Sequence, residues 1–195
     1  DVEGEIRAPQ KFNREGHISA RFSKLTLHEG SRASGRDLPA LSLANMPGIS
    51  LSIERLKYDE LNLGRLKLES SPSGNGQSIN LLELTSPFLF LRGNGQWQKD
   101  STHLRGRASS DQVSALLRSF GFNVNNFVAG HGFLDFNLAW EGSLFTPNVQ
   151  SLSGNARLDL GAGRIVEVGQ ASGAKMDIAR LLSIFSLQAL PRRLA

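Results

Sequence analysis

Apolar and polar residues alternate along most of the chain with a period of two, which predicts β-strands. In "ISLSIERLKYDELNLGRLKLES" (residues 49–70) the apolar positions change phase at 54–55 and again at 64–65. If residues 59–60 form a turn, the two phase changes lie opposite each other, so the paired strands keep their register and bend along one line. We therefore predict a creased hairpin with one apolar face, as part of a curved sheet.

The same spacing of apolar residues occurs once before, 31 residues upstream, in "HISARFSKLTL" (residues 17–27). The first set matches the second set position by position: Ile18, Ala20, Phe22, Leu25 and Leu27 correspond to Ile49, Leu51, Ile53, Leu56 and Tyr58. This is a weak internal repeat of one strand pattern.

Further alternation predicts strands at 79–84, 88–97, 101–109 and 130–140, and two more within 151–168. Only two segments have helical spacing, near residues 110–120 and 175–188. The predicted fold class is mainly β: a curved antiparallel sheet, groove-shaped or taco-like, with two short helices.

The predicted helices are too short to cover the apolar face of seven or more strands. A second sheet, or the same sheet folded over, could cover it and close a β-sandwich core, and a ligand with long acyl chains could cover it as well. Burying each Leu or Ile contributes roughly 1.5–3 kcal/mol in either case, so the energetics do not separate the two interpretations.

Composition limits the function classes. The 195 residues are enough for one domain with a sizeable core. The 22 Lys and Arg against 18 Asp and Glu give a net charge of only +4, and these residues are dispersed, which does not favour nucleic-acid binding. Because Cys is absent, disulfides, zinc-thiolate sites and thiol nucleophiles are excluded. No segment reaches the ~20 apolar residues that span a bilayer.

The sequence contains no recognisable catalytic constellation. Its four His residues are scattered, without the spacing of a metal site, and there is no G-x-S-x-G motif around a Ser nucleophile. The "GNGQ" segments at 74–77 and 93–96 lack a third Gly and do not open a helix, so turns or strand entries are favoured. We expect no enzymatic activity, no metal and no cofactor.

From residue 93 onward the order of motifs resembles a known family. "GNGQW" is followed by a strand and a helix ending in "FGF", then by "GHGFLDFNLAWEG", "SLSGNARLDLGAGRIVEV" and a helix closing on "LPRRL". This order resembles the C-terminal part of the large AsmA-like proteins of Gram-negative bacteria, of the YhdP type. One departure is that Glu141 follows Trp140 where family members usually carry Pro.

The resemblance implies that residues 1–195 are a single β-rich segment of a longer AsmA-like protein, with groove strands in 1–90 and the family-like C-terminal region in 91–195. It implies a protein anchored in the inner membrane, crossing the periplasm and moving phospholipid toward the outer membrane. Lipid tails would then cover the apolar face, and phospholipid and both membranes would be the partners. The alternative is a closed β-sandwich with a structural or interaction role in the cell envelope and no ligand.

The residues expected to line a lipid groove are the apolar members of the predicted strands. They are Ile18, Phe22, Leu25, Leu27, Ile49, Leu51, Ile53, Leu56, Leu61, Leu63, Leu66, Leu68, Leu134, Phe136, Leu138 and Trp140.

Overall fold

The computed structural model describes residues 2–27, 43–119, 127–128, 130–144, 149–161 and 164–165. Nine strands form one open sheet in the order β1-β2-β3-β4-β5-β6-β7-β9-β10. Their bounds are β1 Val2–Arg7, β2 His17–Leu27, β3 Gly48–Tyr58, β4 Leu61–Ser73, β5 Gly76–Thr85, β6 Phe90–Trp97, β7 Ser101–Ser110, β9 Gly132–Glu141 and β10 Ser153–Leu160. The predicted mainly β fold is confirmed.

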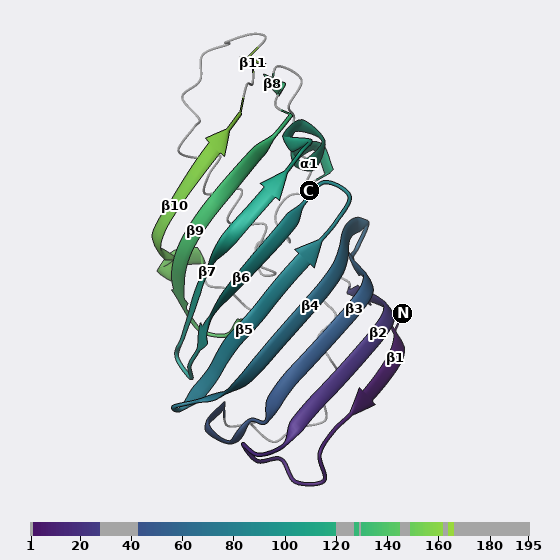
Figure 1. The fold of residues 1–195 in the computed structure, drawn as a ribbon, viewed down its shortest axis with the longest axis vertical. Coiled ribbons are helices and arrows are strands. Elements are labelled where there is room, and N and C mark those ends of the chain that lie inside the picture. The colour runs from purple at the N-terminus through teal and green to yellow at the C-terminus, as the bar shows by residue number, and fades with distance from the viewer. Residues whose placement is uncertain are drawn as a thin grey trace.

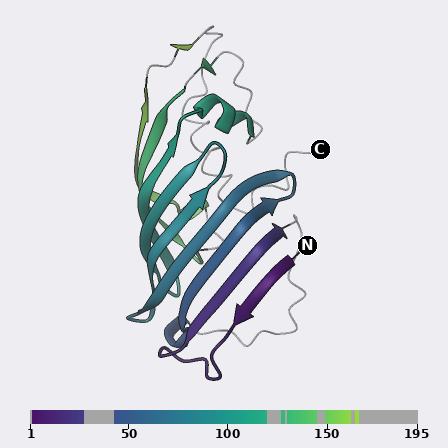
Figure 2. The same cartoon turned by 45° about the vertical axis from the view of Figure 1, so that its right-hand side comes forward.

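The sheet is strongly twisted and curved. Neighbouring strands follow one another in chain order from β1 at one edge to β10 at the other (Figure 1). When the molecule is turned, β9 and β10 come close to edge-on while β1 to β4 are still seen across their faces (Figure 2). The two halves of the sheet therefore face different directions, as the predicted curved sheet requires.

All neighbours in the sheet are antiparallel except β2 and β3, which are parallel. Their register pairs Ile18 with Ile49 and Leu27 with Tyr58, a constant offset of 31 residues. The internal repeat of the sequence is therefore two strands that lie side by side with equivalent residues in contact. The prediction of an antiparallel sheet is corrected at this one pair, which makes the sheet mixed.

The β3–β4 hairpin is irregular where the crease is predicted, but its register is not kept there as expected. Ile53 pairs with Leu66, and the register shifts on both sides of Leu56 before the strands meet again at their shared turn. Leu56 lies opposite Gly64, where the simple count from the turn predicts Leu63. Gly64 has a φ of 81°, a conformation that favours glycine, and it lies within this irregular stretch of the hairpin.

The remaining described elements lie at the ends of the strands. The predicted first helix is confirmed as α1 (Val113–Ser119), and the predicted helix near 175–188 lies outside the described residues. Of the strands predicted in 151–168, β10 joins the large sheet, and β11 (Arg164–Ile165) pairs with β8 (Phe127–Val128) in a separate two-stranded sheet. The described residues also include two 3-10 helices, η1 (Leu43–Asn45) and η2 (Val149–Ser151). None of the described helices is long and apolar enough to cross a membrane.

Candidate functional site

One face of the large sheet carries two rows of apolar residues that run across all nine strands, from one edge to the other. The rows follow from the strand registers, in which each residue is the Cα partner of the next. The first apolar row is Ile6, Ala20, Leu51, Leu68, Leu82, Gly93, Gly106, Phe136 and Ala156. The second apolar row is Gly4, Phe22, Ile53, Leu66, Leu84, Leu91, Ala108, Leu134 and Leu158. Neither row contains a polar or charged side chain.

The sixteen residues predicted to line a groove lie on β2, β3, β4 and β9, and none of them is exposed. Five are buried, with relative exposures of 2–8%: Ile53, Leu56, Leu68, Phe136 and Trp140. The other eleven are half-buried. The structure brings the residues of β2, β3 and β4 together as direct neighbours, whereas those of β9 are separated from them by β5, β6 and β7.

The residues that join these two groups were missed from the sequence. They come from the middle of the sheet, where Leu68, Phe136 and Trp140 share one buried cluster with Ile79, Leu91 and Leu104. Leu82, Leu84 and other half-buried residues pack against this cluster. A row of Cα partners identifies them once the strand order is known, but alternation within a single strand does not.

Glycines interrupt the apolar side chains at the centre of the first apolar row, and Phe136 fills the space above them. A Cβ atom at Gly106 would lie 2.9 Å from Phe136 Cζ, and one at Gly93 would lie 3.6 Å from it. The Phe136 ring therefore extends over two strands, which keeps the face apolar where β6 and β7 supply no side chain.

One end of the apolar face is closed by hydrogen bonds to the neighbouring loops. Ser70 Oγ donates to Gln77 Oε1 (3.0 Å), and Gln77 Nε2 donates to the Met46 carbonyl oxygen (2.9 Å) next to η1. Thr102, which is fully buried, donates to the Gly142 carbonyl oxygen (2.8 Å). We call these contacts the hydrogen-bonded end. Their polar groups are satisfied by the protein itself.

The β9–β10 connection also covers this end. Trp140 Nε1 donates to the Ser143 carbonyl oxygen (2.9 Å), and Leu144 and Leu152 pack against the buried cluster. At the opposite end of the face, α1 begins beside β9, since a Cβ atom at Gly132 would lie 2.9 Å from Val113 Cγ2. The two ends of the strands are therefore built differently.

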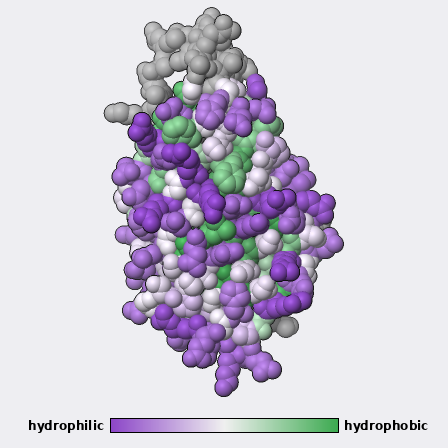
Figure 3. All heavy atoms as spheres, in the orientation of Figure 1, coloured by the Kyte–Doolittle hydropathy of each residue, from purple (hydrophilic) through white to green (hydrophobic). Residues whose placement is uncertain are grey.

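The opposite face of the sheet, which we call the outer face, is polar. Figure 3 looks onto it and shows hydrophilic side chains over most of the surface. Arg107 Nε and Nη2 donate to the two carboxylate oxygens of Asp135 at 2.5 and 2.7 Å, and the guanidinium carbon lies 4.5 Å from the centre of the Phe133 ring. The hydrogen bond from Arg107 lowers the pKa of Asp135. The two faces thus have opposite chemistry.

The histidines of the described residues lie apart from one another. His17 contacts Ser50 (2.9 Å), His103 contacts Asn137 (2.6 Å) and His131 contacts Asp111 (3.3 Å), each in a different part of the sheet. Within the ranges described, no three His, Asp or Glu side chains are placed to hold a metal ion. The main chemical feature of the described sheet is a large apolar face opposite a polar face.

Comparison with known proteins identifies a relative and a family that this chain matches. A curated relative, "Intermembrane phospholipid transporter YhdP" of Escherichia coli (strain K12), is 26% identical over 129 residues, which are 64% of this chain and 10% of that protein. No solved structure is significantly similar. The family model described as "YhdP protein" matches residues 1–195, which includes the first 90 residues, where the sequence showed only a similar style of strand. The chain belongs to the YhdP family.

Proposed function

We propose that this chain is a segment of a conduit that carries phospholipid between the inner and outer membranes, with acyl chains on its apolar face. The observation that carries the proposal is the pair of rows across nine strands that contain apolar residues and glycines but no polar side chain. A name that describes intermembrane phospholipid transport, on a relative of the same family, agrees with it. The matched region is a tenth of that relative, so the conduit would include much more chain than these residues.

The rows also suggest the direction of the path. Along a strand, the apolar face ends after a few residues at the hydrogen-bonded end. Across the strands, it continues to both edges, where Ile6 on β1 and Leu158 on β10 keep 63% and 53% of their surface exposed. We therefore propose that acyl chains move across the strands, from edge to edge of the sheet.

Edge strands normally carry charged residues, bulges or proline that prevent further pairing. Both edge strands carry charged residues, and β1 has a register shift between Glu3 and Gly4. Even so, four of the exposed large apolar residues lie on these two strands: Val2, Ile6, Leu158 and Leu160. This supports the proposal that the sheet continues on both sides, and that residues 1–195 form one β-rich segment of a longer periplasmic protein anchored in the inner membrane.

The alternative is a closed β-sandwich with a structural or interaction role. A sandwich needs a second sheet of comparable size packed on the apolar face. The part of the chain that the structure describes holds one nine-stranded sheet and, besides it, only the two-stranded pair of β8 and β11. The open sheet favours the conduit.

Neighbouring residues on the two faces of β4 provide the test. Leu66 belongs to the second apolar row, whereas Lys67 is exposed on the outer face. A photoreactive residue at position 66 should crosslink to phospholipid when the protein is irradiated in cells, and the same residue at position 67 should not. Equal crosslinking at both positions, or none at position 66, would refute a lipid path on this face.

Replacing the residues at positions 66 and 67 by Asp distinguishes a lipid conduit from a closed core. An unpaired carboxylate among apolar groups costs roughly several kcal/mol, unless water reaches it. In an open groove, Leu66→Asp should lower the bound phospholipid measured by mass spectrometry but keep the cooperative melt, and Lys67→Asp should change neither. In a closed core, Leu66→Asp should abolish the melt.

A further inference from the structure

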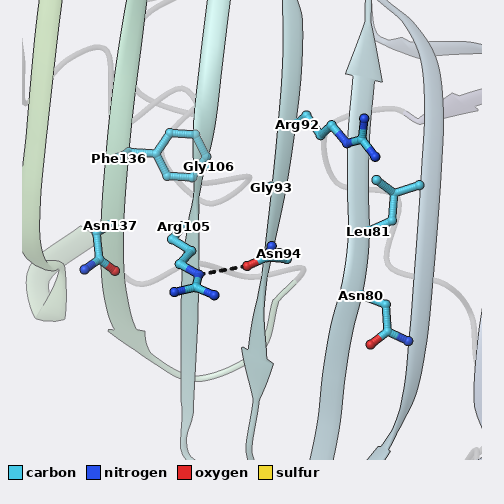
Figure 4. Close-up of a pocket in the computed structure, with 9 residues that line it drawn as sticks. All are labelled: Asn80, Leu81, Arg92, Gly93, Asn94, Arg105, Gly106, Phe136 and Asn137. Atoms are coloured by element: carbon cyan, nitrogen blue, oxygen red, sulfur yellow. Dashed lines mark hydrogen bonds between the residues drawn. The ribbon is translucent and has the colours of Figure 1, made fainter.

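The outer face has a shallow hollow over the middle strands that the lipid path does not use. It has a volume of about 590 Å³ and lies over β5, β6, β7 and β9. Figure 4 shows Asn80, Asn94, Arg105 and Asn137 in one line across these four strands, with Arg92 above them. Among the described residues that line it, Arg92 and Arg105 are the charged ones. Leu81, Gly93, Gly106 and Phe136 complete the lining, and the polar side chains among the lining residues are amides and guanidinium groups.

The composition of this line is unusual for the middle of a sheet. Asn94, Arg105, Asn137 and Asn155 are successive Cα partners on β6, β7, β9 and β10. Asparagine is depleted in strands because its short polar side chain competes with the backbone for hydrogen bonds. A side chain that breaks the local preference several times in one row points to a binding role rather than to folding.

The hydrogen bonds inside the hollow direct donors outward. Arg105 Nε donates to Asn94 Oδ1 at 2.9 Å, and since a guanidinium only donates, this fixes the orientation of the Asn94 amide. The Asn94 Nδ2 group and the terminal nitrogens of Arg105 are then left to face a ligand. His103 Nε2 contacts Asn137 Oδ1 at 2.6 Å, which leaves the Asn137 Nδ2 group as a donor too. The acceptors are used internally.

The charges around the hollow point the same way. Within the described part of the chain, Arg92 makes no ion pair and no side-chain hydrogen bond. Its Cα partners are Glu83 on β5, without a salt bridge to it, and Arg107 on β7. The carboxylate of Asp135 is neutralised by Arg107 through two hydrogen bonds. The local field in the hollow is therefore positive.

We propose that this hollow is a binding site for a phosphate-type oxyanion, held by Arg92, Arg105 and the amide of Asn94. Planar guanidinium groups and amide donors match the oxygens of a phosphate group, which needs several donors and no acceptor. The side chains proposed to hold the anion are separate from the lipid path, because Arg92, Asn94 and Arg105 alternate with the residues of the apolar rows and lie on the opposite face of the sheet. It would give the wall of the conduit an anion-binding outer surface.

Titration with inorganic phosphate at constant ionic strength, followed by backbone amide NMR shifts, tests the site. Residues 94, 105 and 137 should shift together, and Arg105→Gln should weaken the affinity about 10-fold. Arg157→Gln is the matched control, because it removes the same charge from the outer face of β10, outside the hollow. It should weaken the affinity by less than about 2-fold, since exposed charges are screened.

Two further measurements complete the design. If Arg105→Gln lowers the melting temperature, Arg105→Lys keeps the charge but loses the planar donor group, and it should still weaken binding several-fold. Sedimentation with phosphatidylethanolamine vesicles, with and without phosphatidylglycerol, identifies the source of the anion. Arg105-dependent binding to the vesicles identifies a lipid headgroup, and Arg105-dependent binding to inorganic phosphate alone identifies a free phosphate group.

Either result supports an oxyanion site. Binding that Arg157→Gln weakens as much as Arg105→Gln would overturn it, because the attraction would then be diffuse. No Arg105-dependent binding to phosphate or vesicles would overturn it as well. Crosslinking at position 66 reports on the other face, so failure of the anion site and failure of the lipid path are distinguishable.

Discussion

Replacing Phe136 by alanine tests whether this one ring holds the centre of the apolar face together. Phe136 is 8% exposed and lies over Gly93 and Gly106, which have no side chains of their own. When a large side chain is removed from a core, the free energy of unfolding falls by the transfer term plus a term for the cavity that remains.

The cavity term should be large here. Neighbouring side chains usually relax into the space, but the two glycines beneath the ring have nothing to move into it. We expect Phe136→Ala to lower the free energy of unfolding by about 3–4 kcal/mol. For a chain of this length, that corresponds to a melting temperature lower by about 6–16 °C. Gly106→Ala should not restore the loss, since its Cβ would lie 2.3 Å from the Arg92 carbonyl oxygen.

Phe133 on the same strand provides the control. Its ring lies on the outer face under the Arg107 guanidinium, and it is only half-buried. Phe133→Ala should cost about 1 kcal/mol, which is the size of an exposed cation–π contact with some packing. Calorimetry of the two variants decides the matter. Melting temperatures within about 2 °C of each other would refute the special role of Phe136.

Two other predictions follow from the backbone and from the outer face. Gly64→Ala should lower the free energy of unfolding by at least 1–2 kcal/mol more than Gly74→Ala, measured by urea denaturation. Both glycines have positive φ, but a Cβ at Gly64 would lie 2.1 Å from the Thr85 carbonyl oxygen, whereas one at Gly74 meets nothing within 4 Å; equal losses would contradict the crease. Arg107→Gln should raise the pKa of Asp135 in an NMR titration, because the Arg107 hydrogen bond lowers it. A carboxyl group whose pKa is lowered by folding stabilises the protein at pH values above its unfolded-state pKa, and this stabilisation is lost as the pH falls through its folded-state pKa. The variant should therefore show a weaker pH dependence of stability on the acid side. An unchanged Asp135 pKa would contradict the pairing.

Alternation of apolar residues was enough to predict most of the sheet. The phase changes at 54–55 and 64–65 marked where the hairpin is irregular, although the structure shows register shifts there and not the unbroken register that was expected. The pairing of Ile53 with Leu66 follows directly from the turn at 59–60. The turn itself lacks the usual Asn-Gly or Asp-Gly pair, and Asp59 adopts a φ of 48° instead. Local pattern and register therefore carried the prediction where consecutive strands form hairpins.

Two features could not be predicted in this way. The 31-residue repeat matched two strands but did not show that they are parallel neighbours, because a parallel pair depends on the path of the connection between them. The strands β6 and β7 place Gly93, Gly95 and Gly106 on the apolar face. Because glycine has no apolar side chain, the sequences of these strands do not show that the apolar face continues across them. The Phe136 ring on β9 covers Gly93 and Gly106. Such a contact between strands cannot be predicted from the pattern of any single strand.

The single parallel pair has a consequence for how the sheet could be extended. Nine strands that all alternated in direction would begin and end pointing the same way. One parallel step reverses this, so β1 and β10 run in opposite directions, with Val2 and Leu160 at the same end of the strands (Figure 1). The β1 edge of a second sheet with this strand order could then pair antiparallel with the β10 edge while both sheets keep the same orientation. The one parallel pair thus makes the two edges of the sheet complementary in strand direction.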